Sequence, residues 1–319
     1  MSDKPSYGGQ AVIEGVMMRS PRFFAIACRR MNKEIVVQTE PVKSFMTKVK
    51  WLNKPFIRGT LALIDTMMLG MKALMFSTNI AMEDIEEANP PKDKKPAAEA
   101  AVKSDKQSKT KTQTINDITI GATMVFAMAI GVGIFVVGPN LLADLLKKWI
   151  SSSFLFNLAE GGVKFLLFVG YIALISRMKD IRRVFEYHGA EHKVINTFEA
   201  GLDLTPENFA KFSTIHPRCG TSFLLFVIVV SIVVHMFLGW TPVWYERVLY
   251  RLMFLPLIAG IAYEMIKLAG KYKCSKVLNV LMSPGLMLQR LTTRPPSDDQ
   301  VEVALKSLEA VMAKEKETP

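Results

Sequence analysis

The sequence predicts a mainly α-helical, polytopic membrane protein with four transmembrane helices and a small α+β cytoplasmic part. Composition is the first observation, because 50% of the 319 residues are hydrophobic while 22% are charged. Such a chain is too apolar for an ordinary soluble domain and, at a formal net charge of +11, too charged to lie wholly in lipid. The second observation is that apolar and charged residues occupy separate stretches. The chain should therefore divide into membrane-embedded and soluble parts.

Residues 1–88 are expected to form a cytoplasmic strand-rich unit followed by membrane-associated amphipathic helices. Three short apolar runs, Ala11–Met18, Phe23–Cys28 and Glu34–Gln38, predict a sheet of two or three strands. Glu14 interrupts the first run. It is either a solvent-facing residue of an alternating strand or a buried functional carboxylate.

Two helices are expected after the sheet. The apolar positions of Val42–Asn53 recur at helical spacing between lysines, which is typical of a helix on an anionic membrane surface. Arg58–Met82 is long enough for a span, but it contains Asp65 and Lys72, and a span here would place the preceding basic residues outside. We therefore expect this helix to rest against the membrane or against other helices.

Residues 89–115 are rich in lysine and contain prolines, serines and alanines but no aromatic residue. Such a segment buries too little apolar surface to offset its ordering entropy, so we expect a disordered linker. Its charge does not indicate a nucleic-acid partner, because no aromatic residues interleave with the lysines and the positive-inside rule already predicts a basic loop here. The partner we expect is the lipid bilayer, and self-association into a homo-oligomer stays open.

Four apolar stretches follow as expected spans. Residues 116–176 hold Ile118–Val137 and Leu155–Ile175, and residues 221–270 hold Thr221–Trp240 and Val248–Leu268. Lysine and arginine gather on one side of these spans. This asymmetry predicts a multi-pass protein of the cell inner (cytoplasmic) membrane with both termini in the cytoplasm.

Two further cytoplasmic segments are expected. Residues 177–220 form a histidine-rich segment between the two pairs of spans, and residues 271–319 form a tail. In the tail, Ser283-Pro284-Gly285 should break the chain. Ser297–Gln300 is a capping box that should start an amphipathic helix, which we expect to dock on the cytoplasmic domain.

Residues with metal-binding or nucleophilic side chains concentrate in the histidine-rich segment. The chain has four histidines and three cysteines, of which three histidines and one cysteine fall within Tyr187–Lys193 and His216–Cys219. If residues 180–199 form a helix, His188 and His192 stand one turn apart on one face, within reach of a single metal ion. The cysteines are too sparse for a disulfide framework, so free thiols are expected.

Four stretches carry a resemblance to a known family. They are Gly8–Arg19, Tyr187–Lys193, His216–Ser222 and Pro284–Thr293, in this order. In these stretches the chain resembles the YqhQ-like bacterial membrane proteins, a family of unknown function. The resemblance implies an integral membrane protein, described loosely as a predicted metal-dependent enzyme, with no substrate to carry over.

The residues themselves favour a divalent metal, with zinc first. His188-x-x-Glu191-His192 matches the pattern of the inverted zincins, in which the two histidines bind the metal and the glutamate acts as base. His216 and Cys219 would complete a tetrahedral set of nitrogen and sulfur ligands, which suits Zn²⁺. Four protein ligands would make the site structural, whereas three ligands and a water would make it catalytic.

Three further residues are candidates for the site. Glu264, near the cytoplasmic end of the last expected span, is another source of an oxygen ligand. Glu14 and Arg19 are candidates to meet the histidines in space. The competing interpretation is a hydrogen-bonded polar cap on the helix bundle, in which Cys219 is a buried thiol at the start of a span.

Two classes of function follow, and the sequence leaves open whether the protein is an enzyme. The first is a metal-dependent hydrolase of unknown substrate at the cytoplasmic face, in which Glu191 handles the proton. The second is a non-enzymatic membrane assembly or transport factor with a structural metal or a polar cluster. An open coordination position beside a pocket separates the two. The sequence contains no phosphate-binding glycine loop, dinucleotide fingerprint or serine nucleophile elbow, which argues against nucleotide-driven pumping and serine hydrolysis.

Overall fold

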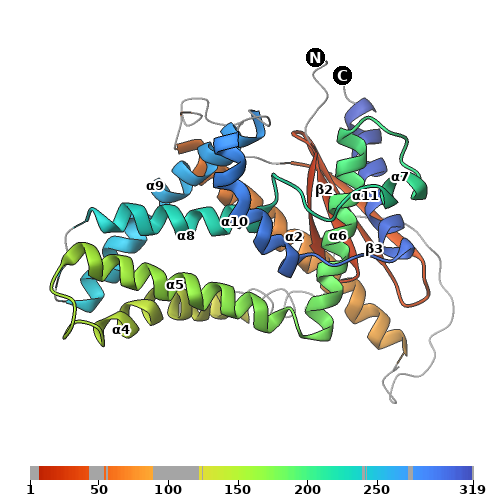
Figure 1. Ribbon diagram of the computed structural model, residues 1–319. Coiled ribbons are helices and arrows are strands. Elements are labelled where there is room, and N and C mark those ends of the chain that lie inside the picture. Colours follow the sequence, from red (N-terminus) through yellow and green to blue (C-terminus); the bar gives the residue numbers. More distant parts are fainter. Residues whose placement is uncertain are drawn as a thin grey trace, which may run out of the picture.

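The computed structural model describes residues 7–42, 54, 57–88, 122–123, 125–238, 241, 243–271 and 276–317. The expected surface helix at Val42–Asn53 lies almost wholly outside the described residues, as does the expected linker at 89–115, so both stay predictions. The described part is mainly helical and holds one small antiparallel sheet (Figure 1). Long helices occupy one side of the molecule, and the sheet with its covering helices occupies the other.

The sheet has four strands in place of the two or three predicted. β1 (Gly8–Val12), β2 (Gly15–Arg19), β3 (Phe23–Arg29) and β4 (Ile35–Pro41) form an antiparallel meander in chain order. The run that we expected as one strand is split by a turn, in which Glu14 has a φ of 51°. Because Val12 and Gly15 pair directly across this turn, Glu14 is a turn residue, and its reading as part of a strand is wrong.

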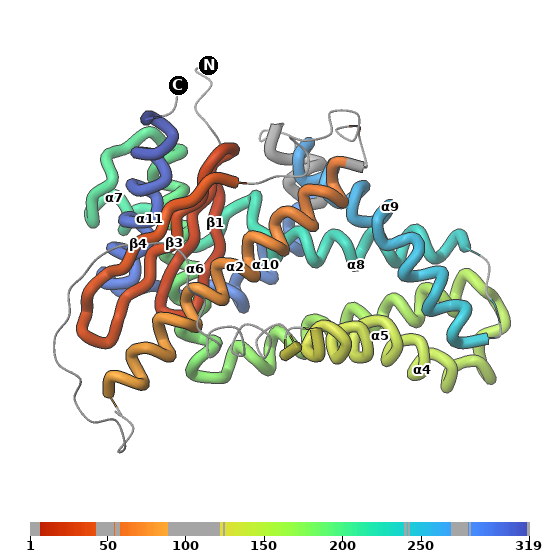
Figure 2. The backbone as a smooth tube through the Cα atoms, turned by 180° about the vertical axis from the view of Figure 1, so that it is seen from behind, coloured from red at the N-terminus to blue at the C-terminus, as the bar shows by residue number. Residues whose placement is uncertain are grey.

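Helices cover both faces of the sheet. Successive side chains of a strand point to opposite faces, so consecutive apolar residues in these strands make both faces apolar. The covering helices are α2 (Ile57–Ala88), α6 (Lys179–Glu199) and α11 (Asp298–Glu317). Phe24 and Ile26 of β3 pack with Leu69 of α2, whereas the intervening Ala25 packs with Leu308 of α11 on the opposite face. Figure 2 shows α2 running from the sheet to the long helices, so that it joins the two sides of the molecule.

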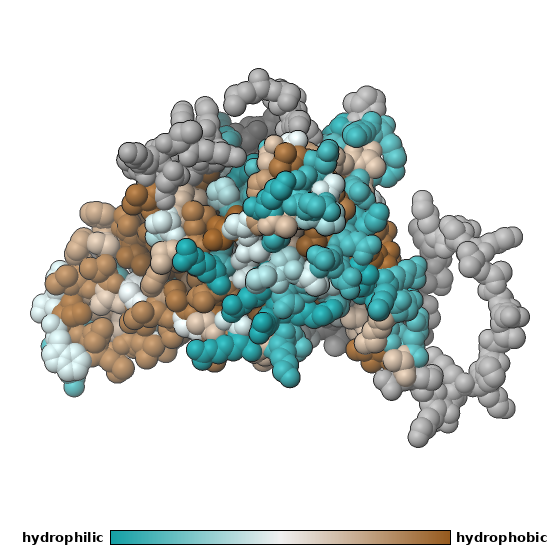
Figure 3. Space-filling model, turned by 45° about the vertical axis from the view of Figure 1, so that its right-hand side comes forward, coloured by the Kyte–Doolittle hydropathy of each residue, from teal (hydrophilic) through white to brown (hydrophobic). Residues whose placement is uncertain are grey.

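The remaining helices build the apolar side. They are the π-helical η2 (Gly133–Val137), α4 (Gly138–Asp144), α5 (Ser153–Ile175), α8 (Gly220–Met236), α9 (Trp244–Lys271) and α10 (Lys276–Thr292), while the short α7 (Pro206–Ala210) follows α6. The surface follows the same division, with hydrophobic side chains at the helical end and hydrophilic ones around the sheet (Figure 3).

Within the part of the chain that the structure describes, four helices are long and apolar enough to cross a membrane: Arg58–Ala88, Val125–Asp144, Ser153–Ile175 and Trp244–Leu268. The number agrees with the prediction, but the set differs. The stretch expected as the third span forms a helix of 17 residues. This length corresponds to about 26 Å, against a bilayer core of roughly 30 Å. Conversely α2, expected to lie against the membrane or other helices, is long and apolar enough to span, and it also packs against the sheet and α9.

The tail confirms one expectation and corrects another. The Ser297 N–H donates to Gln300 Oε1 at 2.9 Å, as in a capping box, and α11 docks its apolar stripe on β2 and β3. Pro284 does not break the chain but lies inside α10. Proline removes the hydrogen bond to the carbonyl four residues earlier, and here the Ser283 hydroxyl donates to that Val280 carbonyl at 2.7 Å.

Candidate metal centre

Helix α6 carries three of the candidate residues on one face. Its register places His188, Glu191 and His192 together, as the sequence predicted. The neighbouring Tyr187 and Ala190 are buried in the core between α6, α11 and the sheet, which fixes the rotation of α6 about its axis. As a result the two imidazole rings lie 4.4 Å apart between centroids.

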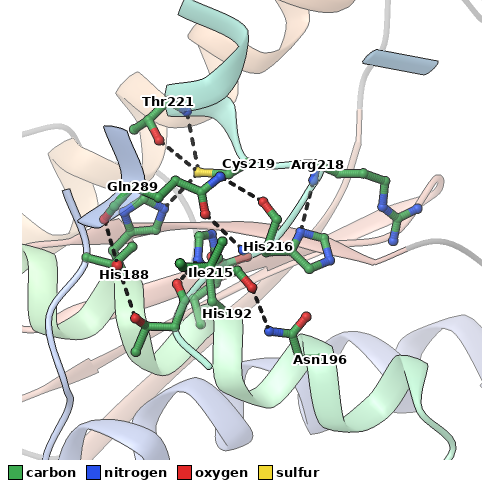
Figure 4. A network of polar contacts seen from close by, with 12 residues as sticks. His188, His192, Asn196, Ile215, His216, Arg218, Cys219, Thr221 and Gln289 are labelled. Atoms are coloured by element: carbon green, nitrogen blue, oxygen red, sulfur yellow. Dashed lines mark hydrogen bonds and ion pairs between the residues drawn. The ribbon is translucent and has the colours of Figure 1, made fainter. Parts of the chain in front are cut away.

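The second ligand segment returns to α6 through α7 and a loop. The Asn196 side chain of α6 donates to the Ile215 carbonyl of this loop at 3.1 Å. The buried Gln289 of α10 accepts the His216 N–H and donates to the His216 carbonyl, both at 2.8 Å. Two helices thus hold the loop, and the chain enters α8 at Cys219 (Figure 4).

His188, His192 and Cys219 form a compact group, called the His–Cys cluster below. One potential ligand atom from each lies within 4.8 Å of the other two. The Cys219 Sγ is 3.3 Å from His188 Nε2. Two ligands of a tetrahedral zinc ion lie about 3.3–3.6 Å apart, given zinc to ligand lengths of about 2.0–2.3 Å. The Cys219–His188 pair therefore has the spacing that zinc needs, and the other two pairs lie within 4.8 Å.

Backbone carbonyls orient both imidazoles. His188 Nδ1 lies 2.8 Å from the Thr292 oxygen, and His192 Nδ1 lies 2.5 Å from the Thr214 oxygen. A carbonyl oxygen only accepts, so each Nδ1 carries the proton and donates it, which leaves each Nε2 with a free lone pair. Histidines that bind metals in proteins are held in this way.

A glycine between the two histidines allows the carbonyl segment to approach. A β-carbon at Gly189 would lie 2.0 Å from the Arg294 oxygen. The Arg294 N–H also donates to the Phe185 carbonyl at 2.9 Å, which ties this segment to α6. Gly189 therefore lets the chain come close enough for the Thr292 carbonyl to reach His188.

Glu191 is buried beside the cluster. Its side chain accepts the Gly9 N–H of β1, and its Oε2 lies 3.4 Å from His192 Nε2. Gly9 is required here, since a β-carbon on it would lie 2.8 Å from Glu191 Cγ. Burial raises the pKa of the Glu191 carboxyl, against a smaller lowering by His188 and His216. A carboxylate with a raised pKa is a stronger base than an exposed one, which suits it to accept a proton.

His216 lies beside the His–Cys cluster and not within it. Its ring centroid is 5.6 Å from that of His192. Its Nδ1 accepts the Arg218 N–H at 3.3 Å, and its Nε2 lies 3.4 Å from Glu199 Oε1 without hydrogen-bond geometry. The structure thus groups three of the four predicted ligands and leaves His216 turned toward a carboxylate.

The three further candidates lie in different places. Arg19 lines the cavity beside the cluster. Glu14 pairs with Arg183 of α6, because the turn after β1 directs its carboxylate toward that helix. Glu264 pairs with Arg58 of α2. Glu14 and Glu264 therefore do not join the cluster.

A cavity of ≈ 520 Å³, called the site cavity below, adjoins the His–Cys cluster. Its wall combines the cluster with basic side chains and with apolar side chains of the long helices. It includes His188, Glu191, His192 and Cys219, then Arg19, Arg218 and Lys267, and then Leu63, Phe223, Tyr263 and Ile266. The cluster is thus accessible to a ligand larger than water.

Thr214, Gln289 and Thr292 have no role in the predicted site, yet they hold its ligands. Gln289 and Thr292 do lie in one of the stretches that carry the family resemblance. A usable signal was present, because Gln289, Thr292 and Thr293 end a segment that begins with apolar residues, and buried polar groups need partners.

Comparison with known proteins relates the site to a family. The family described as Protein of unknown function (DUF1385) matches residues 54–314. A protein of Bacillus subtilis (strain 168), described as Uncharacterized protein YqhQ, is 36% identical over 309 residues, which cover 97% of this chain and 92% of that one. No solved structure matches. The resemblance is confirmed, but neither description mentions a metal or an activity, so the metal prediction rests on the residues alone.

Proposed function

Since the chain belongs to the DUF1385 family, whose description names no activity, we propose a function from the site itself. The protein is a membrane-bound, metal-dependent hydrolase whose divalent metal is held by His188, His192 and Cys219. Zinc is favoured, because imidazole and thiolate ligands suit it. The observation that carries the proposal is the convergence of three ligand atoms within 4.8 Å, beside a cavity of ≈ 520 Å³.

The residues present fit a divalent metal on chemical grounds. Two imidazoles, each anchored through Nδ1 to a carbonyl, and one ionisable thiol give a donor set found in catalytic zinc sites. His216 is turned toward Glu199, so three protein ligands leave a coordination position for water or substrate. Three ligands and an open position are typical of catalytic rather than structural sites.

Glu191 is the proton carrier in this proposal. A bound divalent metal supplies Lewis acidity, which polarises a carbonyl or phosphoryl group and lowers the pKa of water. The Glu191 carboxylate accepts a proton from the attacking water and delivers it to the leaving group. Burial raises the pKa of this carboxyl, which makes it a stronger base for the first transfer.

The site cavity favours an amphiphilic substrate with negative charge. Arg19 and Lys267 bring positive charge to its wall, where Arg218 is paired with Glu199, while Phe223 and Ile266 give the cavity an apolar side. The first and last described elements, β1 and α11, both pack against α6, so both ends of the described chain lie on the side of the molecule that holds the cluster. This common side supports a site at the cytoplasmic face of a bacterial inner membrane, with both termini in the cytoplasm.

A second enzymatic candidate rests on the same thiol. Cys219 caps the N-terminus of α8, where its Sγ accepts the Thr221 N–H at 3.4 Å, and Sγ lies 3.3 Å from His188 Nε2. A thiol at a helix N-terminus beside an imidazole is typical of cysteine nucleophiles. In this alternative His188 Nε2 accepts the thiol proton of Cys219, and the thiolate attacks an acyl group to form a thioester. The imidazolium of His188 then gives this proton to the departing group, and water hydrolyses the thioester.

The non-enzymatic alternative is a membrane assembly or transport factor with a structural metal or a polar cluster. This alternative predicts a site in which protein side chains occupy every coordination position. The cluster instead forms part of the wall of the site cavity, which argues for chemistry on a bound molecule.

Elemental analysis of detergent-purified protein separates these functions. Wild type and Glu191→Gln should each hold about one zinc per chain, and His192→Ala should hold almost none. His235→Ala is the matched control, because His235 lies in the last turn of α8, away from the cluster. Equal metal content in wild type and His192→Ala would end the metal hypothesis.

Cobalt substitution and alkylation assign the role of Cys219. A thiolate-to-cobalt charge-transfer band in wild type should be absent in Cys219→Ser. If Cys219 binds a metal, iodoacetamide should modify it only after the metal has been removed. If the protein is purified without metal and Cys219 is modified fast, this would favour the role of Cys219 as a nucleophile. Hydrolysis of chromogenic esters, phosphates and anilides should be lost in Glu191→Gln that still holds metal. Full activity of that variant would reject Glu191 as the base.

A further inference from the structure

A second group of buried charges lies among the long helices, at the end of the bundle remote from the sheet (Figure 1). Arg251 of α9 pairs with Glu160 of α5, and these residues are only 7% and 2% exposed. Arg247, one turn earlier on α9, donates to Asp144 of α4 at 2.6 Å. Charged side chains within membrane helices are costly and commonly mark functional sites. None of these four residues belongs to the proposed metal centre.

A cavity of ≈ 440 Å³, called the distal cavity below, adjoins these charges. Arg247, Arg251 and His235 line its polar side. Tyr250 and Met253 line it as well, and they are 47% and 62% exposed on the surface of α9. A ligand therefore reaches this cavity from the side of α9 that lipid would cover.

Two polar atoms of the cavity residues have no hydrogen-bond partner among the described residues. They are Arg251 Nη1 and His235 Nε2, and both are buried. His235 is hydrogen-bonded to the Ser231 backbone, which leaves Nδ1 as the donor and Nε2 as an acceptor. The distal cavity thus offers an unused donor and an unused acceptor, and leaving such groups buried and unpaired is unfavourable.

The buried carboxylates here do not match their cations one to one. Asp144 is shared between Lys147 and Arg247, and Glu160 is shared between Lys164 and Arg251. These shared pairs carry an excess of positive charge. An anionic ligand would balance this excess and accept from Arg251 Nη1, and a hydroxyl on the same ligand would satisfy His235 Nε2.

We propose that the distal cavity binds an anionic phospholipid with a hydroxylated headgroup, of the phosphatidylglycerol kind. Its phosphodiester accepts from Arg251 Nη1 and offsets the positive charge. A headgroup hydroxyl donates to His235 Nε2. The acyl chains lie against Met253 and Phe254 on the lipid side. This site is separate from the metal centre and does not depend on the proposed hydrolase activity.

Lipid binding to the detergent-purified full chain tests the proposal. Native mass spectrometry and the thermal midpoint are recorded with phosphatidylglycerol, with phosphatidylcholine and with inorganic phosphate. Wild type should retain phosphatidylglycerol, and its midpoint should rise with that lipid alone. Glu160→Gln frees Arg251 from its carboxylate, so this variant should keep or strengthen the preference.

The double variant Glu160→Gln/Arg251→Gln is the critical comparison, because it removes the cation without leaving its buried partner charge unpaired. It should bind phosphatidylglycerol at least about tenfold more weakly, with unchanged metal content. An unchanged lipid preference in this variant would overturn the proposal. If Glu160→Gln alone weakened phosphatidylglycerol binding as much as the double variant does, the Glu160–Arg251 pair would be purely structural and the proposal would be overturned. Equal stabilisation by inorganic phosphate would overturn the assignment to a lipid.

Discussion

Replacing Gly189 by alanine should disturb the metal centre from a position that makes no contact with the metal. The added β-carbon would lie 2.0 Å from the Arg294 oxygen, whereas ordinary contacts begin at 3.4 Å. The carbonyl segment must therefore retreat by about 1.4 Å from α6. A shift of this size lengthens two hydrogen bonds beyond their useful range: His188 Nδ1 to the Thr292 oxygen, now 2.8 Å, and the Arg294 nitrogen to the Phe185 oxygen, now 2.9 Å.

The free-energy cost of Gly189→Ala follows from these contacts. Overpacking costs about 1–3 kcal/mol, and each lost hydrogen bond costs about 1 kcal/mol. Alanine regains up to about 1 kcal/mol of helix propensity. The net loss is about 2–4 kcal/mol, which lowers the thermal midpoint by roughly 5–15 °C. His188 also loses the carbonyl that orients it, so metal affinity should fall about 10–100-fold.

Thermal unfolding and zinc titration of detergent-purified protein measure both effects of Gly189→Ala. Gly162→Ala in α5 is the matched control, since a β-carbon there meets nothing within 4 Å. The control should be as stable as wild type and bind zinc equally well. If Gly189→Ala matched the control in both measurements, the close approach of Arg294 to α6 would be wrong, and with it the orientation of His188.

Three other predictions concern the support of the site, a buried thiol and the tail. Gln289→Leu leaves His216 backbone groups without partners and should cost about 2–4 kcal/mol in thermal unfolding, whereas Met287→Leu, exposed on the same helix, should be neutral. Burial raises the pKa of Cys28 from 9.0 to about 12, so its contribution to stability is complete below pH 9 and is lost as the pH rises to about 12. Cys28→Ala should lack this alkaline loss in denaturant titrations, and native Cys28 should resist iodoacetamide at about pH 9. A chain that ends before Asp298 lacks α11, so one face of its sheet is uncovered and limited proteolysis should digest the sheet. The sheet of a control chain that ends at Glu317 should resist digestion.

The parts of the site that depend on local geometry could be predicted from the sequence. His188 and His192 share a face because four residues complete about one helical turn, and this relation needs no knowledge of the rest of the fold. Cys219 is brought back toward them by α7 and the loop that follows it. Its actual position, however, depends on two side chains that hold the preceding loop. Asn196 donates to the Ile215 carbonyl, and Gln289, which lies 73 residues after His216 in the chain, donates to the His216 carbonyl.

The misassignments have physical causes that act over longer range. Glu14 lies in an apolar run, but it has a positive φ and forms a turn. The apolar residues before and after this turn belong to two different strands, β1 and β2. Pro284 remains helical because a serine hydroxyl replaces the missing donor. The charges of α2 argued against a span, yet Lys72 pairs with Glu40 of the sheet, a contact that no local pattern predicts.

The packing of α11 on β2 and β3 has a consequence for the synthesis of the protein. About 270 residues separate Arg29, at the end of β3, from Asp298, at the start of α11. At about 5–20 residues per second, a ribosome needs roughly 15–50 s to cover that interval. Throughout this time the strands have emerged but Ala25, Ala27 and their neighbours lack the helix that buries them. The apolar helices are made in this interval, so the unit around the sheet closes only after α11 has been made, and a prematurely terminated chain stays open to proteases.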